Sequence, residues 1–118
     1  MSFSLTTPLI VNRRKTVTRR TGWRFLKPGD QVQAVEKARG LKAGDMNRLA
    51  VLRIVDVRRE PLRRMIDDPA YGESEIVLEG FEGHPQLAAP ERWVEYFAST
   101  HDCTIDDEIT RIAFAYVT

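Results

Sequence analysis

The sequence predicts a small α+β domain built on a curved or closed, mostly antiparallel β-sheet with short helices beside it. The chain has 118 residues, 42% hydrophobic and 30% charged, a composition typical of one globular domain over residues 1–118. Several segments alternate polar and apolar residues, as half-buried strands do, and turns or short loops separate most of them. Other segments have helical spacing, so both kinds of element are expected.

Four segments have the residue pattern of strands: 15–19, 31–36, 49–57 and 108–117. β-Branched residues favour the first. Regular alternation favours the second, which follows the turn signal Pro28-Gly29-Asp30. The third is the most apolar, and residues 40–45 before it indicate a hairpin loop. The last has two partly apolar faces. We expect four or five strands in all.

Helical signals occur at four places: 7–12, 62–66, 73–78 and 90–97. Pro8 suits the first helical position, with Thr7 as a possible cap. Pro61 ends the preceding strand and can begin the second helix. Gly80 suits the left-handed position after the third. The fourth has apolar residues at 93, 94 and 97, which share one face.

Charge is distributed unevenly along the chain. Residues 1–64 carry 16 Lys or Arg against 5 Asp or Glu, and residues 65–118 carry 2 against 12, although the net charge is only +1. Such asymmetry indicates a nucleic-acid partner. Alternatively, the two halves fold together and neutralise each other through ion pairs, because sequence position does not fix spatial position. Both interpretations stay open.

Several classes of protein are not expected. No apolar stretch approaches the length of a bilayer span, and no charged leader precedes the short apolar run near the N-terminus. The single cysteine, Cys103, excludes an internal disulfide and a cysteine-based zinc site. His84 and His101 lack metal-ligand spacing, and no phosphate- or dinucleotide-binding motif is present. We therefore expect a soluble, cytoplasmic protein without a membrane, metal or cofactor.

A basic cluster over residues 13–20 is followed by aromatic residues between further cations. Cations interleaved with flat rings suit a nucleotide, because the cations meet phosphate and the rings stack on bases. The candidate binding residues are Arg14, Arg19, Arg20, Trp23 and Arg24. The alternative is that the aromatic residues here pack in the core or a loop, which is their more frequent role.

Lys15, Thr18 and Glu79 are candidates for chemistry. A threonine hydroxyl is a nucleophile only when a base takes its proton, and a lysine can do so only if burial or neighbouring cations lower its pKa. Residues three apart in a strand point to opposite faces, so a bend near residues 12–16 is needed. Glu79 ends a predicted helix, where its charge opposes the helix dipole. The alternative is a solvated basic edge with a structural threonine.

These residues together resemble the ASCH domain family. The resemblance rests on Lys15-Thr16-Val17-Thr18-Arg19-Arg20, the Pro28-Gly29-Asp30 turn, the strand to Arg58, Glu79-Gly80-Phe81 and Thr110-Arg111-Ile112. The family signature is G-x-K-x-x-E-x-R. Lys15 and Arg20 match it, while Arg13 and Thr18 stand at its Gly and Glu positions. The chain looks most like small stand-alone members from bacteria and phages, and Thr18 makes it similar to the N4-acetylcytidine amidohydrolases.

The resemblance implies a PUA-like β-barrel of about five strands, flanked by short helices and bearing a cleft for RNA or a modified nucleobase. It also implies that Lys15 acts as the base and Thr18 as the nucleophile on the acyl carbon. Glu79 would orient Lys15 or pass a proton to the leaving amine. Arg20 would hold the pyrimidine carbonyl or stabilise developing negative charge.

Three functions follow as hypotheses. The first is a hydrolase that cleaves the amide of N4-acylated cytosine nucleosides, converting N4-acetylcytidine to cytidine. The second is a module that binds single-stranded RNA without catalysis, with an affinity that falls steeply with salt. The third is a ribonuclease of the same fold. The first is favoured because all three catalytic positions carry suitable residue types. The oligomeric state is left open.

Overall fold

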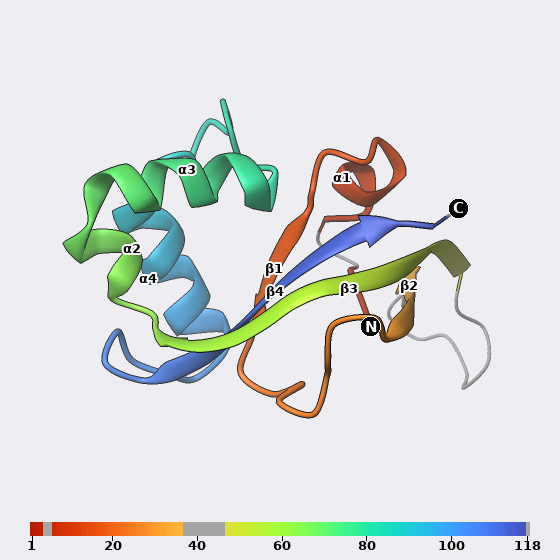
Figure 1. The fold of residues 1–118 in the computed structure, drawn as a ribbon. Helices are drawn as coiled ribbons and strands as arrows, with labels where there is room; N and C mark the ends of the chain where they lie inside the picture. The colour runs from red at the N-terminus through yellow and green to blue at the C-terminus, as the bar shows by residue number, and fades with distance from the viewer. Residues whose placement is uncertain (4–5, 37–46, 118) are drawn as a thin grey trace.

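The protein is described by a computed structural model over residues 1–3, 6–36 and 47–117 (Figure 1). Its elements in chain order are α1 (Thr7–Val11), β1 (Val17–Arg20), β2 (Gln31–Glu36), β3 (Asn47–Pro61), α2 (Arg64–Asp67), α3 (Pro69–Glu79), α4 (Pro90–Thr100) and β4 (Glu108–Tyr116). They confirm the predicted α+β class. None of the described helices is long and apolar enough to cross a membrane. The predicted hairpin loop at residues 40–45 lies outside the described residues.

β3 and α3 are longer than the sequence patterns predict. β3 continues beyond residue 57 to Pro61, so the proline is the last strand residue and α2 begins only at Arg64. α3 begins at Pro69, well before residue 73. Asp68 caps it, because its side chain accepts a hydrogen bond from the Tyr71 N–H (3.2 Å). The earlier start adds a turn to the helix that carries Glu79.

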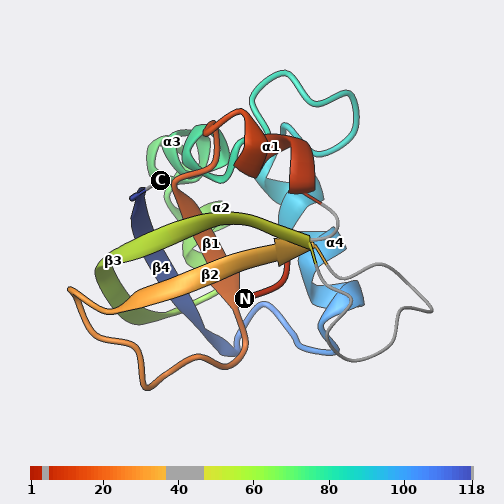
Figure 2. The same ribbon diagram turned by 90° about the vertical axis from the view of Figure 1, so that its right-hand side faces the viewer.

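The four strands pair in the order β1-β4-β3-β2, and every pair is antiparallel. Within the described residues this is an open sheet with β1 and β2 at its edges, whereas the resemblance implies a barrel of about five strands. Figure 2 shows β2 and the adjoining part of β3 crossing over β1 and β4, so the sheet is strongly curved. Ser2 extends the sheet by a parallel bridge with Val35 of β2.

A bulge in β3 decides which of its side chains reach the helices. The register against β4 shifts between Ile54 and Asp56. The extra residue reverses the alternation of side chains beyond it. Ile54 and Val57 therefore both face the same core cluster. Arg58 and Glu60 face the opposite side, where they contact α3.

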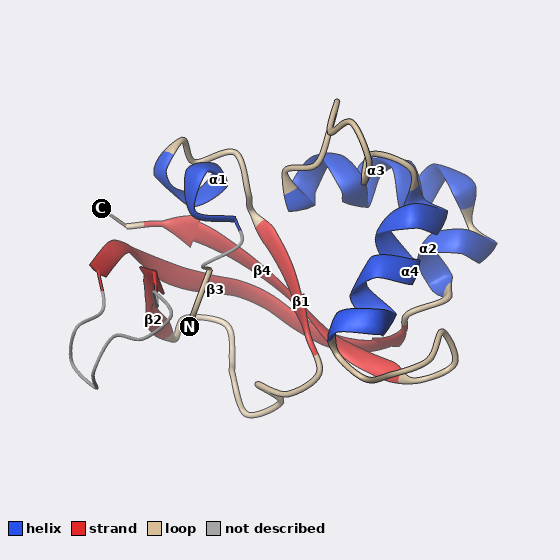
Figure 3. Ribbon diagram, turned by 180° about the vertical axis from the view of Figure 1, so that it is seen from behind, coloured by secondary structure: helices blue, strands red, loops and turns tan. Residues whose placement is uncertain are grey.

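Two hydrophobic clusters lie on the two faces of β4. The first, enclosed by the curved sheet and α1, contains Phe3, Ile10, Leu26, Ala34, Ala50, Leu52, Ile54, Ile112 and Phe114. The second lies among the other helices and contains Leu62, Met65, Ile76, Trp93, Val94, Phe97 and Ile109. Helices α2, α3 and α4 gather at one end of the long strands, and α1 lies at the other (Figures 1 and 3). The last strand thus has two apolar faces, as predicted.

Candidate functional site

The candidate site begins where the chain passes from α1 to β1. This passage runs along the C-terminal end of α3, and the Thr16 N–H donates to the Leu78 carbonyl (2.9 Å). α3 ends at Glu79 because Gly80 adopts the left-handed conformation (φ 93°) that the sequence predicts for it. Lys15 and Glu79 therefore meet, although they lie 64 residues apart in the sequence.

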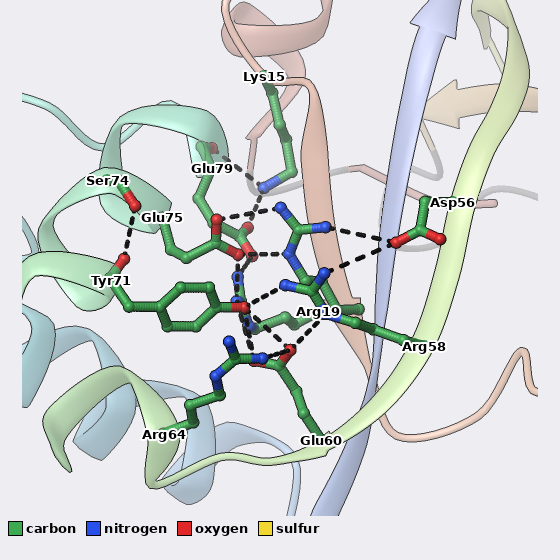
Figure 4. A network of polar contacts seen from close by, with 11 residues as sticks. Lys15, Arg19, Asp56, Arg58, Glu60, Arg64, Tyr71, Ser74, Glu75 and Glu79 are labelled. Carbon is green, nitrogen blue, oxygen red and sulfur yellow. Dashed lines mark hydrogen bonds and ion pairs between the residues drawn. The ribbon is translucent and has the colours of Figure 1, made fainter. Parts of the chain in front are cut away.

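Lys15 and Glu79 form a buried ion pair (Figure 4). The Lys15 Nζ lies 2.6 Å from Glu79 Oε1 and also donates to the Glu79 main-chain carbonyl (3.1 Å). The second carboxylate oxygen, Oε2, accepts a hydrogen bond from Arg19 Nη1 (3.0 Å). All three side chains are at most 5% exposed. Glu79 is thus shared between an amine and a guanidinium group.

Glu75, one turn before Glu79 on α3, extends this contact into a network of buried charges. It accepts hydrogen bonds from Arg19 and Arg111. The charged side chains buried in the described residues are Lys15, Arg19, Arg111, Glu60, Glu75 and Glu79. Lys15 and Arg19 from the basic half of the chain thus pair with carboxylates from the acidic half. This arrangement agrees with the ion-pair interpretation of the charge asymmetry.

A cavity of about 410 Å³ opens beside this network. Lys15, Thr18 and Glu79 all line it, together with Arg19 and Arg20. Most of the remaining wall is aromatic, and the other lining residues are Ser2, Phe3, Thr6, Phe81, His84, Leu87, Trp93, Tyr96, Phe97 and His101. The volume lies in the usual range for small-molecule sites. The wall offers flat rings against which a base could stack.

Thr18 reaches the cavity from the face of β1 that is opposite to the Arg19 side chain. It pairs with Ile112, which belongs to the cluster inside the curved sheet, whereas Arg19 points toward α3. Lys15 precedes the strand. Lys15 and Thr18 both line the cavity because β1 is an edge strand, which leaves one of its sides unpaired. The Thr18 hydroxyl accepts a hydrogen bond from Arg20 Nε (3.3 Å). Within the described residues, no hydrogen bond joins it to the ion pair.

Burial sets the electrostatics of the cationic side chains. It lowers the pKa of the Lys15 amine below the ordinary value of about 10.4; the charge and hydrogen bond of Glu79 oppose this, while Arg20 and Arg19 add to it. Burial also lowers the pKa of Arg20. For Arg19, burial acts in the same direction, but the carboxylates of Glu79 and Glu75 outweigh it and raise the pKa. A lysine with a lowered pKa is suited to accept a proton.

The other predicted binding residues have different surroundings. Arg14 is exposed and lines a separate hollow, where its Nη2 lies 3.5 Å from the Glu82 carbonyl oxygen. Trp23 lines a second hollow next to the cavity, and the neighbouring Arg24 is exposed. The Arg19 side chain is 0% exposed and bound to carboxylates. Its guanidinium group is therefore not available to a phosphate in this arrangement.

Two of the three carboxylates buried in the described residues, Glu60 and Glu75, and the aromatic wall of the cavity were not predicted from the sequence. Glu75 stands four residues before Glu79, a spacing that puts both carboxylates on one face of a helix, and this signal could have identified it. Glu60 and Arg111 carry no comparable local signal, because their partners lie on other elements. Trp93, predicted as part of the core face of a helix, also borders the cavity.

The histidines make local contacts. His84 Nδ1 accepts hydrogen bonds from the Gln86 and Leu87 N–H groups (3.1 and 3.0 Å). His101 stacks on Phe97 with ring centroids 3.9 Å apart. In the part of the chain that the structure describes, no group of three or more His, Cys, Asp or Glu residues is placed to hold a metal ion.

Comparisons with known proteins bear on the fold. The chain matches no protein-family model and no curated protein. Among solved structures it is similar to the crystal structure of protein EF3133 from Enterococcus faecalis V583, described under the family designation DUF984. The TM-score is 0.57 and the sequence identity is 20%, over 94% of this chain and 69% of the other. At this identity the likeness supports a shared fold alone.

Proposed function

We propose that the protein is a hydrolase that cleaves the amide of N4-acylated cytosine nucleosides, releasing cytidine and acetate from N4-acetylcytidine. The observation that carries this proposal is that an amine, a hydroxyl group and a carboxylate line one cavity, with the amine and the carboxylate 2.6 Å apart. A nucleophile, a base and an acid are the groups that acyl transfer needs. The resemblance to the ASCH family assigns the same three residues to this reaction.

In the first half of the reaction, a proton shifts from Lys15 to Glu79 within their ion pair, which leaves a neutral amine. The amine takes the Thr18 hydroxyl proton as the oxygen attacks the acyl carbon. The protonated carboxyl of Glu79 then gives its proton to the cytosine nitrogen, and the C–N bond breaks. Cytidine leaves with its amino group complete, and the acyl group remains as an ester on Thr18.

In the second half, water hydrolyses the ester. The Glu79 carboxylate accepts a proton from the attacking water, and the Lys15 ammonium group returns a proton to the Thr18 oxygen as the ester bond breaks. Acetic acid is released, and it ionises in water. The neutral amine and the protonated carboxyl are restored. Arg20 donates to the Thr18 oxygen in the resting site, and it would stabilise the negative charge that develops on the acyl oxygen beside Thr18.

We also propose that the curved sheet corresponds to the PUA-like barrel that the family resemblance implies. The N-terminal residues support this, because they occupy the space between the two edge strands. The Phe3 N–H donates to the Val35 carbonyl of β2 (2.9 Å), and Arg20 Nη2 of β1 donates to the Ser2 carbonyl (2.7 Å). In this interpretation, the N-terminal residues Ser2 and Phe3 occupy the position of a further strand of the barrel.

The test is to incubate the purified protein with N4-acetylcytidine and to measure cytidine and acetate. The wild type should release both in equal amounts. Lys15→Met and Glu79→Gln should lose turnover by at least about a hundredfold, because each removes a proton carrier. Arg53→Ala is the control, since this side chain is exposed on β3 and outside the cavity. Undetectable hydrolysis by the wild type, or full activity in both site variants, would contradict the proposal.

A binding protein without catalysis is the second candidate. One observation favours it: the Lys15 amine already donates to the Glu79 carboxylate and to its main-chain carbonyl, as in a structural ion pair. In that case N4-acetylcytidine would remain intact, and single-stranded RNA would bind with an affinity that falls steeply as salt is raised. Binding that does not respond to salt would argue against this candidate.

A further inference from the structure

A second hollow of about 410 Å³ adjoins the cavity that holds Lys15 and Glu79. It is lined by Arg20, Thr21, Gly22, Trp23, Phe25 and His101. Arg20 and His101 line both spaces. The two hollows are therefore neighbours that share part of a wall, and a ligand that fills one is placed to extend into the other.

The second hollow carries an exposed pair of aromatic rings. Trp23 and Phe25 have ring centroids 5.5 Å apart at an interplanar angle of 34°. Phe25 is 71% exposed, the largest value among the exposed large hydrophobic side chains of the described residues. Trp23 is partly buried against the core cluster inside the curved sheet, which anchors the pair. A ring this exposed adds little to folding, and an exposed apolar group beside a hollow is typical of a contact site.

The charge at the second hollow suits a phosphate. Arg20 donates one hydrogen bond from Nε to the Thr18 hydroxyl oxygen and another from Nη2 to the Ser2 carbonyl oxygen. Its Nη1 makes no hydrogen bond to the described residues. None of the residues that line the hollow is acidic, and the exposed Arg24 lies between the two aromatic residues in the sequence. A cation between two ring-binding spaces matches a nucleotide strand, in which phosphate joins neighbouring bases.

We propose that the second hollow is a subsite for the base of an adjacent nucleotide, so that the protein takes its cytosine as part of a nucleic-acid strand. The first base occupies the cavity, the neighbouring base stacks on Phe25 and Trp23, and the linking phosphate lies against Arg20. This inference rests on the proposed function for the assignment of the first base. It concerns binding alone, so it can be tested without turnover.

The two tryptophans of the chain provide the test, because Trp93 lines the cavity and Trp23 lines the second hollow. Trp23→Phe leaves Trp93 as the sole indole reporter, and Trp93→Phe leaves Trp23. The probes are cytidine and a cytidine–adenosine dinucleoside monophosphate. Cytidine should quench Trp93 alone. The dinucleotide should quench both and bind roughly tenfold more tightly, since one stacked base contributes on the order of this much.

A matched pair of variants isolates the aromatic contact. Phe25→Ala should remove the tenfold advantage of the dinucleotide and leave the affinity for cytidine unchanged. Val55→Ala is the control, because Val55 is also exposed (52%) but lies on β3, outside both hollows. Equal loss in both variants would overturn the assignment of Phe25.

Three other results would overturn the inference. The dinucleotide could quench Trp93 alone with the affinity of cytidine, which leaves the second hollow empty. It could quench Trp23 alone, which makes the hollows independent. An aromatic tripeptide could quench Trp23 where the dinucleotide does not, which points to a protein partner. Quenching of both tryptophans without any hydrolysis of N4-acetylcytidine would instead contradict the proposed function and leave this inference standing.

Discussion

At the scale of single residues, Lys15 experiences opposing influences. Burial and the guanidinium groups of Arg20 and Arg19 favour the neutral amine, whereas Glu79 favours the ammonium ion. The net effect lowers the pKa of the amine. Arg19 contributes in a second way, because it binds one oxygen of Glu79 and so divides the carboxylate between two cations. The site therefore holds a lysine that gives up its proton at a lower pH than a lysine in water.

The rate of N4-acetylcytidine hydrolysis should fall as the pH rises through the lowered pKa of Lys15, and the fall should begin below about pH 10.4, the ordinary pKa of lysine. The physical reason is that Lys15 and Glu79 share one proton, which Glu79 gives to the leaving nitrogen, and alkaline pH removes this proton from the pair. The measurement is kcat as a function of pH, from neutral to alkaline. Lys15→Arg should be inactive throughout, since arginine stays protonated. A wild-type rate that rises over this range and levels off would count against the shared proton of Lys15 and Glu79.

At the scale of elements, α3 is positioned by a close contact with the end of α2. Gly72 lies at this contact, and a Cβ placed there would come within 2.0 Å of the Met65 carbonyl oxygen and 3.1 Å of Pro90 Cβ. No side chain fits without movement of the backbone. Because α3 carries Glu75 and Glu79, the same contact sets the position of both carboxylates relative to β1.

Gly72→Ala should therefore lower the free energy of unfolding by about 1–3 kcal/mol, as overpacking at a close contact does. It should also reduce hydrolysis, because a shift of α3 changes the position of Glu79 relative to Lys15. Urea denaturation measures the first effect. Gly22→Ala is the control, since a Cβ at Gly22 has no atom within 4 Å. Equal stability of the two variants would show that the packing at Gly72 is not limiting.

Elements with strong local signals could be predicted from the sequence, and others could not. The polar–apolar alternation of residues 31–36 predicted β2, and the apolar face that contains Trp93 predicted α4. In both elements the apolar side chains of the pattern face the core, so the local pattern was enough. The start of α3 was missed, although Asp68 before Pro69 is a recognisable cap. The bulge near Asp56 has no glycine or other local signal, so the side on which Glu60 lies depends on pairing with β4.

At the scale of the whole molecule, buried ion pairs link the sheet to the helices. Burial would raise the pKa of Glu75, but hydrogen bonds from Arg111 and the charge and hydrogen bond of Arg19 lower it to about 2. The pKa of Glu60 is also lowered, because hydrogen bonds from Arg58 and Tyr71 outweigh burial. Both carboxylates are therefore held in the ionised form by the folded state.

The folded state should lose stability as the pH falls from about 4.3 to about 2. A carboxyl group whose pKa is lowered by folding stabilises the protein above its unfolded pKa, and this stabilisation is lost as the pH falls through the folded value. For Glu75 the loss is on the order of 3 kcal/mol.

Urea denaturation across this pH range, on the wild type and two variants, is the measurement. Glu75→Gln should be less stable at neutral pH and respond less to acid. Glu73→Gln is the control, because Glu73 is exposed on the same helix. A wild-type stability that does not change in this range would contradict the described network.

The candidate site was predictable only in part. The family resemblance named Lys15, Thr18 and Glu79, but sequence spacing could not establish that Glu79 lies against Lys15. That contact depends on the chain crossing the end of α3 and on the left-handed turn at Gly80. Arg19 was expected to bind a phosphate, but its side chain is buried among carboxylates. The reason is that Arg19 faces α3, and the carboxylates of α3 that it contacts are those of Glu75 and Glu79.

The most direct test of the central claim compares Thr18→Val with Thr18→Ser. Valine has nearly the shape of threonine without the hydroxyl group, and serine keeps the hydroxyl group. The measurement is kcat for N4-acetylcytidine, with cytidine binding as a check that the cavity is intact. We predict that Thr18→Ser retains hydrolysis and that Thr18→Val loses it while still binding cytidine. Hydrolysis by Thr18→Val at the wild-type rate would contradict a covalent role for Thr18 and the proposed mechanism with it.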